Sequence, residues 1–163
     1  MDYLNIIQSK ILFDRSKIEN TLAVWRFKNQ KVIFTNGCFD IIHRGHIEYL
    51  AKAASLGDQL VIGLNTNASV KRLKGTQRPI QDENTRALVL ASFSFVSKVI
   101  LFDEDTPIEL IRLVQPDVLV KGGDYKPENI VGYDIVTARG GEVVTIELVQ
   151  GHSTTSIINK LSQ

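Results

Sequence analysis

The sequence predicts an α/β fold, a doubly wound parallel sheet of five strands with helices on both faces. From residue 31 onward, short apolar and β-branched runs alternate with segments of helical periodicity. The apolar runs are nearly continuous, as expected for strands that are buried on both faces. The expected strands are residues 31–35, 59–64, 98–101, 117–120 and 142–146, and the expected helices lie near residues 45–56, 83–95, 106–114 and 130–139.

Capping signals set the expected helix starts. Ser16 and Glu19 form a capping box that opens a helix reaching about Lys28. Residues 106–109, Thr-Pro-Ile-Glu, combine a second capping box with proline at the first helical position. A last helix is expected to begin at residues 153–154. These signals predict a helical extension over residues 1–30 and a single domain over residues 31–163.

Composition restricts the classes of function. The chain has 163 residues with 44% hydrophobic and 23% charged side chains, which is ordinary for one globular domain. Its 19 Lys and Arg residues against 18 Asp and Glu residues predict no nucleic-acid or anionic-membrane partner. A single cysteine fits a reducing compartment, and no segment resembles a signal peptide or a membrane span. We therefore expect a cytoplasmic protein.

The most informative stretch is residues 34–46, Phe-Thr-Asn-Gly-Cys-Phe-Asp-Ile-Ile-His-Arg-Gly-His. A strand ends in a turn containing Gly37, and His43 and His46 then open a helix. A helix N-terminus presents free N–H groups and the positive end of its dipole, and residues three apart share a face. Gly45 carries no side chain that would block close approach. This pattern favours binding of the phosphates of a nucleoside triphosphate.

Other interpretations of the two histidines remain open. Either one alone is ordinarily a solvated or capping residue, and His-x-x-His is also a spacing found in zinc sites. Cys38 is the one cysteine and His152 the one other histidine, which leaves too few ligands for zinc. We therefore predict no protein-held metal site.

A second polar turn follows the expected strand 117–120. It reads Lys-Gly-Gly-Asp-Tyr over residues 121–125. Ligands of doubly wound sheets bind beyond the carboxyl ends of the strands, where the strand order reverses. If these two strands are neighbours, the turns at residues 35–37 and 121–125 form one pocket. Residues 74–84 are expected to form a mobile loop beside it.

Two motifs resemble those of a known family. Residues 37–46 resemble the first signature of the cytidylyltransferase-like nucleotidyltransferases, and residues 151–155, Gly-His-Ser-Thr-Thr, resemble the second. Residues 35–40, 71–75, 78–79 and 120–128 are similar to the adenylyltransferase domain of heptose 1-phosphate enzymes. The resemblance covers about residues 31–161 and implies a Rossmann-like nucleotidyltransferase fold.

The resemblance implies a reaction. The enzyme would join D-glycero-β-D-manno-heptose 1-phosphate to ATP, giving ADP-heptose and pyrophosphate for lipopolysaccharide-type glycans. Mg²⁺ is expected, held mainly by the ATP phosphates. Many relatives carry this domain behind a sugar kinase; too little chain precedes residue 31 for one here, so we expect a separate kinase upstream. A homodimer is also expected.

The motifs and the resemblance together give the expected site. The catalytic residues would be His43, His46, Lys74 and Arg86. Nucleotide would be bound by Thr35, Asn36, Gly37, Cys38, Phe39, Gly45, Lys121, Gly122, Gly123, Asp124, Ser153, Thr154 and Thr155. The acceptor substrate would contact Asp40, Lys74, Arg78 and Tyr125. Lysine and arginine suit phosphate groups, and Arg86 occupies a position where the family commonly carries a phosphate-binding arginine.

Two alternative functions remain. A cytidylyltransferase acting on glycerol or ethanolamine phosphate would share the fold and the mechanism. It is disfavoured by Leu148, because cytidylyltransferases carry an arginine at that position. A non-catalytic nucleotide-binding module would be signalled by loss of a histidine or of the Ser/Thr turn, and both are intact.

Overall fold

A computed structural model describes residues 1–123, 125–147 and 154–161; for residues 155, 156, 159 and 161 it describes the backbone alone. The strands are β1 (Ile11–Leu12), β2 (Val32–Gly37), β3 (Gln59–Asn65), β4 (Lys98–Phe102), β5 (Val118–Gly122) and β6 (Glu142–Ile146). The helices are α1 (Tyr3–Gln8), α2 (Arg15–Phe27), α3 (Arg44–Ala54), α4 (Asn67–Lys74), α5 (Glu83–Ser92), α6 (Ile108–Val114), α7 (Tyr133–Thr137) and α8 (Thr154–Leu161), with a 3₁₀ turn η1 at Pro127–Asn129.

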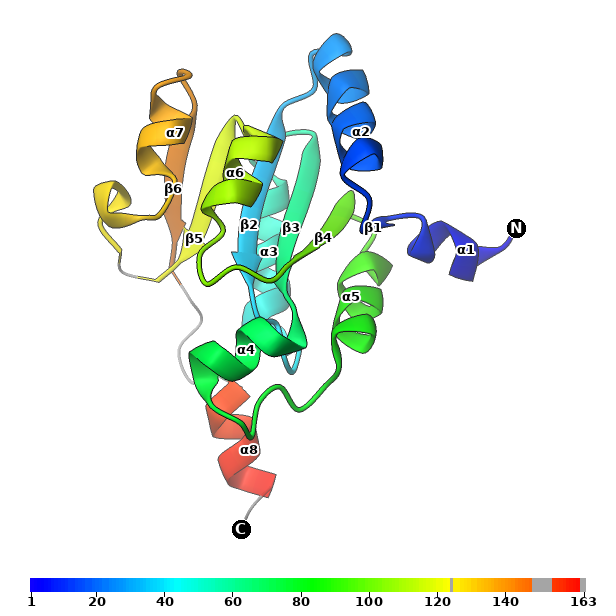
Figure 1. Ribbon diagram of the computed structural model, residues 1–163, viewed down its shortest axis with the longest axis vertical. Coiled ribbons are helices and arrows are strands. Elements are labelled where there is room, and N and C mark those ends of the chain that lie inside the picture. The colour runs from blue at the N-terminus through cyan, green and yellow to red at the C-terminus, as the bar shows by residue number, and fades with distance from the viewer. Residues whose placement is uncertain (124, 148–153, 162–163) are drawn as a thin grey trace.

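All the strand pairs are parallel, in the order β1-β4-β3-β2-β5-β6 (Figure 1). The predicted doubly wound sheet is confirmed, and each of the five expected strands is present. The strand number is wrong by one, because β1 adds a sixth strand at the edge beside β4. With only two residues, β1 is too short to give a hydrophobic pattern in the sequence.

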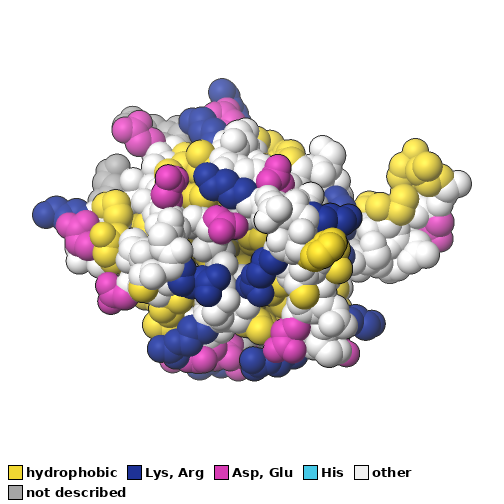
Figure 2. Space-filling view, turned by 90° about the horizontal axis from the view of Figure 1, so that it is seen from above, with side chains coloured by type: hydrophobic (Ala, Val, Ile, Leu, Met, Phe, Trp, Pro, Cys, Tyr) yellow, Lys and Arg dark blue, Asp and Glu magenta, His cyan; other side chains and the backbone are white. Residues whose placement is uncertain are grey.

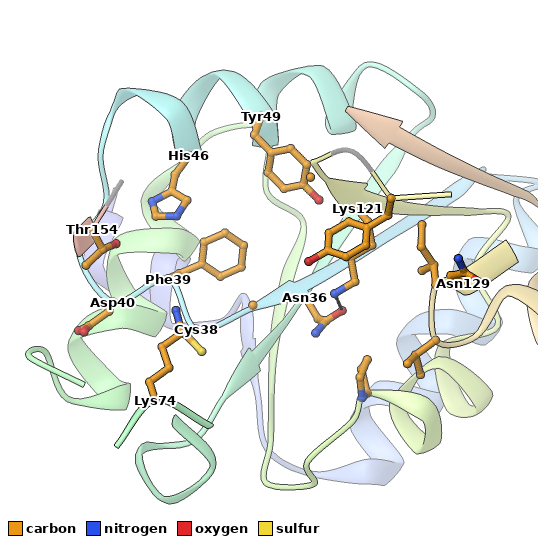
Figure 3. A pocket seen from close by; sticks show the side chains of 16 residues that line it. Asn36, Cys38, Phe39, Asp40, His46, Tyr49, Lys74, Lys121, Asn129 and Thr154 are labelled. Atoms are coloured by element: carbon orange, nitrogen blue, oxygen red, sulfur yellow. Dashed lines mark hydrogen bonds between the residues drawn. The ribbon is translucent and has the colours of Figure 1, made fainter. Parts of the chain in front are cut away.

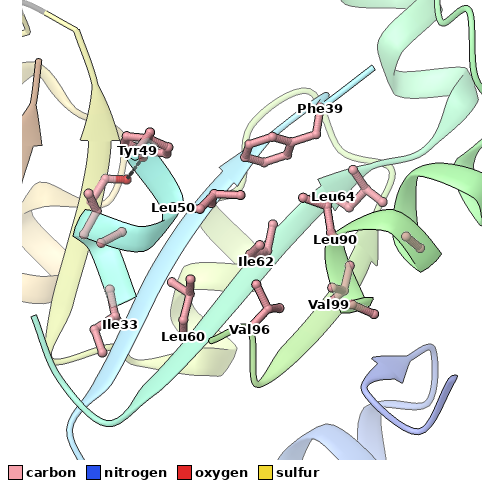
Figure 4. Close-up of a cluster of buried hydrophobic side chains, with 14 of the residues drawn as sticks. Ile33, Phe39, Tyr49, Leu50, Leu60, Ile62, Leu64, Leu90, Val96 and Val99 are labelled. Atoms are coloured by element: carbon pink, nitrogen blue, oxygen red, sulfur yellow. Dashed lines mark hydrogen bonds between the residues drawn. The ribbon is translucent and has the colours of Figure 1, made fainter. Parts of the chain in front are cut away.

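Successive residues of each strand point to opposite faces and so build two cores. Ile33, Leu60 and Ile62 pack on one face with residues of α3 and α5 (Figure 4). Phe34 and Val61 pack on the other face with residues of α2, α6 and α7. Helices therefore cover both faces of the sheet, as Figure 1 shows for α3 behind it and α6 in front.

Several helix boundaries differ from the expectation. Helix α2 begins two residues early, because the Asp14 carboxylate caps it by accepting hydrogen bonds from both the amide and the hydroxyl of Ser16. Helix α6 begins after Pro107, which occupies the capping position without a side-chain bond. The expected helices 83–95 and 130–139 are shorter, ending at residue 92 and covering residues 133–137. Helices α1 and α4 were not predicted.

The strand order reverses beside β2. From β2 the chain crosses to β3 on one side, and β5 later returns to the other side of β2. The turns after β2 and β5 therefore lie next to each other, as the sequence predicted, at the lower end of the sheet in Figure 1. Figure 2 looks onto the opposite end, where acidic and basic side chains are interspersed. Within the described ranges, each helix is too short or too polar to cross a membrane.

Candidate functional site

A cavity of about 420 Å³ lies at the carboxyl edge of the sheet, beyond β2 and β5 (Figure 3). Strand ends, the first turn of α3, the end of α4 and the start of α8 all contribute to its wall. The lining residues are Asn36, Gly37, Cys38, Phe39, Asp40, His46, Tyr49, Lys74, Pro107, Lys121, Gly122, Tyr125, Asn129, Ile130, Val131 and Thr154.

The turn after β2 is shaped by an aromatic ring. Phe39 adopts a left-handed backbone conformation with φ of 44°, which is uncommon for a residue with a side chain. Its ring lies against Gly37, where an added Cβ would stand 3.0 Å from Phe39 Cε2. A larger residue at position 37 would therefore push this ring away by a few tenths of an ångström.

The two histidines lie together at the start of α3. His43 is the residue that precedes the helix, His46 lies in its first turn, and their rings stack with centroids 3.8 Å apart. Phe39 meets the His46 ring edge-on at 5.3 Å. His46 lines the cavity, whereas His43 stacks on its ring and is not among the described lining residues.

The environment of His46 fixes its charge. Burial, together with the nearby His43 and Lys74, lowers the pKa of His46 to about 4, although a hydrogen bond with the Ile41 backbone acts in the opposite direction. The imidazole is therefore neutral at pH 7. A neutral imidazole carries one N–H, so His46 can donate to the Ile41 backbone or to a ligand, but not to both at once.

Two further predicted residues reach the same part of the cavity. Lys74 ends α4 and lines the wall, so the expected loop begins inside a helix. Thr154 begins α8 and lines the wall as well, and its hydroxyl donates to the Ile41 carbonyl at 3.5 Å. Asp124, Ser153 and the side chain of Thr155 lie outside the described residues.

Asp40 organises the loop that follows α4. Its carboxylate accepts hydrogen bonds from the backbone amides of Ile80 and Gln81, at 2.8 and 2.9 Å, and from Arg78 Nε at 2.6 Å. Burial alone would raise the pKa of Asp40, but these hydrogen bonds lower it below its ordinary value. Asp40 and Arg78 were both expected to contact the acceptor substrate. In the structure they form an ion pair with each other, and only Asp40 is among the described lining residues.

Arg86, expected to be a catalytic residue, is not among the described residues that line the cavity. Its side chain is fully buried. Its guanidinium donates to the carbonyl oxygens of Gln81, Cys38 and Asn65 and to the side chain of Asn67, at 2.7 to 3.0 Å. These bonds join the turns after β2 and β3 to the start of α5, so Arg86 holds these segments together. The sequence predicted a contact with phosphate for this residue.

The strand ends supply the remaining predicted residues. Thr35 is fully buried and bonded at 2.6 Å to the hydroxyl of Tyr49, which lines the cavity. Asn36 and Lys121 form a hydrogen-bonded pair on the wall. Gly122 and Tyr125 also line the wall, Gly123 has a φ of 108°, and Gly45 is buried within α3.

Some lining residues were missed by the sequence reasoning. Tyr49 is three residues after His46, and this helical spacing could have placed both on one face. Pro107 follows the carboxyl end of β4, so the sheet order could have placed it. Residues 129–131 carry no sequence signal for the cavity, because they reach it through the irregular path between β5 and α7.

Comparisons with known proteins show the family to which the chain is similar. Residues 34–160 match the model of the cytidylyltransferase-like family. "Bifunctional protein HldE" of Syntrophotalea carbinolica is 53% identical over 147 residues, covering 90% of this chain and 30% of the relative. The Caulobacter vibrioides protein of the same name is 53% identical over 149 residues, covering 91% and 31%. The chain thus spans about a third of the length of these relatives.

Solved structures show the same fold. A lipopolysaccharide core biosynthesis protein from Thermoplasma volcanium superposes with a TM-score of 0.59 at 28% identity, covering 76% of this chain and 99% of that one. A pantoate-β-alanine ligase from Francisella tularensis superposes with a TM-score of 0.63 at 15% identity, covering 94% and 79%, which concerns the fold alone. On the match over residues 34–160 and the cavity at the end of β2, the chain belongs to the cytidylyltransferase-like family of nucleotidyltransferases.

Proposed function

We propose that the protein is an adenylyltransferase that joins ATP and D-glycero-D-manno-heptose 1-phosphate to give ADP-heptose and pyrophosphate. The observation that carries this proposal is the cavity beyond β2, where His46, Lys74 and the start of α8 converge. The sugar acceptor is supported by the resemblance of residues 120–128 and by the similarity to a lipopolysaccharide core biosynthesis protein. Leu148 supports ATP over CTP.

The reaction needs positioning more than a strong base. An oxygen of the acceptor phosphate attacks the α-phosphorus of ATP and forms a new P–O bond. The bond from the α-phosphorus to the bridging oxygen breaks, and pyrophosphate leaves with the electron pair. The acceptor is already an anion, so no proton has to be removed. Catalysis then depends on alignment and on stabilising the charge that develops on phosphorus.

The residues around His46 suit the triphosphate. The neutral imidazole donates one hydrogen bond, and the N-terminus of α3 supplies amides and the positive end of a dipole. Lys74 adds a charge on a long, adjustable side chain. His43 fixes the His46 ring by stacking.

Magnesium is expected to arrive bound to the nucleotide. Within the described ranges, no group of three His, Cys, Asp or Glu residues is arranged to hold a metal ion. We therefore propose that Mg²⁺ binds mainly to the phosphate oxygens of ATP, where it neutralises charge.

Pyrophosphate release tests the function. Wild-type protein and His46→Ala are incubated with Mg²⁺, heptose 1-phosphate and either ATP or CTP. We expect release that requires ATP and the sugar phosphate and that falls about 10²–10³-fold in the variant. Release with CTP and glycerol or ethanolamine phosphate would establish the cytidylyltransferase instead. Binding of ATP without turnover on any acceptor would establish a nucleotide-binding module.

Two partners follow from this reaction and from the family resemblance. The acceptor is a sugar phosphate, so a sugar kinase has to supply it. We further propose a homodimer. Light scattering of the purified chain tests this proposal, and the mass of one 18.2 kDa chain would contradict it.

A further inference from the structure

The ammonium group of Lys121 is a half-buried cation on the cavity wall. It extends from the end of β5, and burial lowers the pKa of Lys121 below its ordinary value. Its Nζ donates to Asn36 Oδ1 at 2.7 Å. Among the residues that the structure describes, it meets no carboxylate. A half-buried charge that has only a neutral partner is unfavourable, and a bound anion would relieve this cost.

This cation is separate from the residues around His46. Figure 3 shows His46, Thr154 and Lys74 on one side of the cavity and Lys121 with Asn36 on the other, with the Phe39 ring between them. One cavity therefore offers two places for an anion. A triphosphate and a phosphate monoester are the two anions that the proposed reaction requires.

The chemistry of phosphoryl transfer assigns the two places. The attacking and leaving oxygens lie roughly in line on opposite sides of the phosphorus atom. If pyrophosphate leaves toward His46 and Lys74, the acceptor phosphate must approach from the opposite side. Among the described lining residues, Lys121 is the charged one on this opposite side.

We propose that Lys121, oriented by Asn36, binds the phosphate of the sugar 1-phosphate acceptor. This inference rests on the proposed function and replaces the expectation that Lys121 binds the nucleotide. The cavity wall also contains Asn129, Ile130 and Pro107, which combine an amide with apolar contacts. Such a mixed surface suits the polar hydroxyls and the apolar carbon skeleton of a sugar.

Steady-state kinetics of Lys121→Met test the assignment. Removing a charge-assisted hydrogen bond should raise the KM for the acceptor by about 10- to 100-fold. The KM for ATP should change by less than about twofold, because ATP phosphates bind around His46. Lys52→Met, at an exposed position on α3, is the matched control and should change neither value.

Asn36→Asp provides a second, independent variant. An aspartate beside Lys121 would be a permanent anionic partner and would compete with the acceptor phosphate, so the acceptor KM should again rise selectively. This variant keeps the size of the side chain. It tests the assignment even if Lys121→Met does not fold, and a thermal melt shows whether Lys121→Met is folded.

Inorganic phosphate distinguishes failure of this inference from failure of the proposed function. In the wild type it should inhibit competitively against the acceptor and not against ATP, and calorimetry should show phosphate binding that Lys121→Met abolishes. A variant that raises the KM for ATP as much as that for the acceptor would overturn the assignment, as would unchanged phosphate binding. Absence of wild-type turnover would contradict the proposed function alone, because phosphate binding would still decide the role of Lys121.

Discussion

His46 is neutral at neutral pH because the fold removes it from water and places it beside His43 and Lys74. An unfolded chain carries an ordinary histidine that binds a proton near pH 6.5, while folded His46 binds one only near pH 4. Between these values the unfolded state holds more protons, so the free energy of unfolding falls as the pH is lowered. We expect a loss of about 1–2 kcal/mol over this range, after allowing for the partial exposure of the ring.

Urea unfolding at several pH values measures this loss. The comparison is between the wild type and His46→Asn, because the other two histidines are present in both. The variant should lose less stability between pH 6.5 and pH 4. Parallel curves for the two proteins would show that His46 does not carry the effect.

Cys38 gives a direct reading of nucleotide binding. It is the one cysteine of the chain, it is half-buried, and its side chain lines the cavity. A bound triphosphate should therefore shield it, and ATP with Mg²⁺ should slow its alkylation severalfold, as followed by mass spectrometry. In the urea-unfolded protein ATP should have no effect. Equal rates with and without ATP in the folded protein would place the nucleotide away from the turn after β2.

At the scale of elements, Arg86 ties the ends of two paired strands, β2 and β3, to the loop before α5. Its guanidinium satisfies carbonyl oxygens from the turn after β2, the end of β3 and Gln81, two residues before α5. Arg86→Met would leave these carbonyls buried without a donor, so we expect a loss of about 3–5 kcal/mol of unfolding free energy. Arg72 is the matched control, since its side chain is 45% exposed and it bonds to Asp103 and Asp105 at the surface.

Thermal melts of Arg86→Met and Arg72→Met separate these two kinds of arginine. The melting temperature should fall strongly in the first variant and only slightly in the second. A folded Arg86→Met with an unchanged melting temperature and a weakened affinity for ATP would return Arg86 to the role expected from the sequence.

The same contrast explains how far the sequence could predict the site. The strands and the histidine turn were predictable, because nearly continuous apolar runs and a glycine turn act over a few neighbouring residues. The position of Arg86 was not, because its partners lie up to 48 residues away and are backbone carbonyls without a sequence signature. Helix α4 was not predicted because it is only eight residues long and mostly exposed, so it has too few apolar residues to show a helical pattern.

At the scale of the whole molecule, residues 1–30 take part in the same structure as the rest. Strand β1 pairs with β4, and Leu22 of α2 is 2% exposed within the core that also contains Phe34 and Ile111. The sequence predicted a helical extension over this segment. Because of this strand pairing and core burial, we expect the segment to unfold together with the sheet.

Leu22→Ala tests this coupling. Truncation of a buried leucine costs about 2–5 kcal/mol, and the loss should appear as a shift of the entire unfolding transition. Val24→Ala lies two residues further on the same helix at 51% exposure, so it should shift the transition by less than about 0.5 kcal/mol. Circular dichroism reports the helices, and the fluorescence of the single tryptophan, Trp25, reports α2 directly. If both probes move together in Leu22→Ala, α2 belongs to the cooperative unit. If the tryptophan signal melts early while the remaining transition stays at the wild-type midpoint, the first thirty residues form a separate unit.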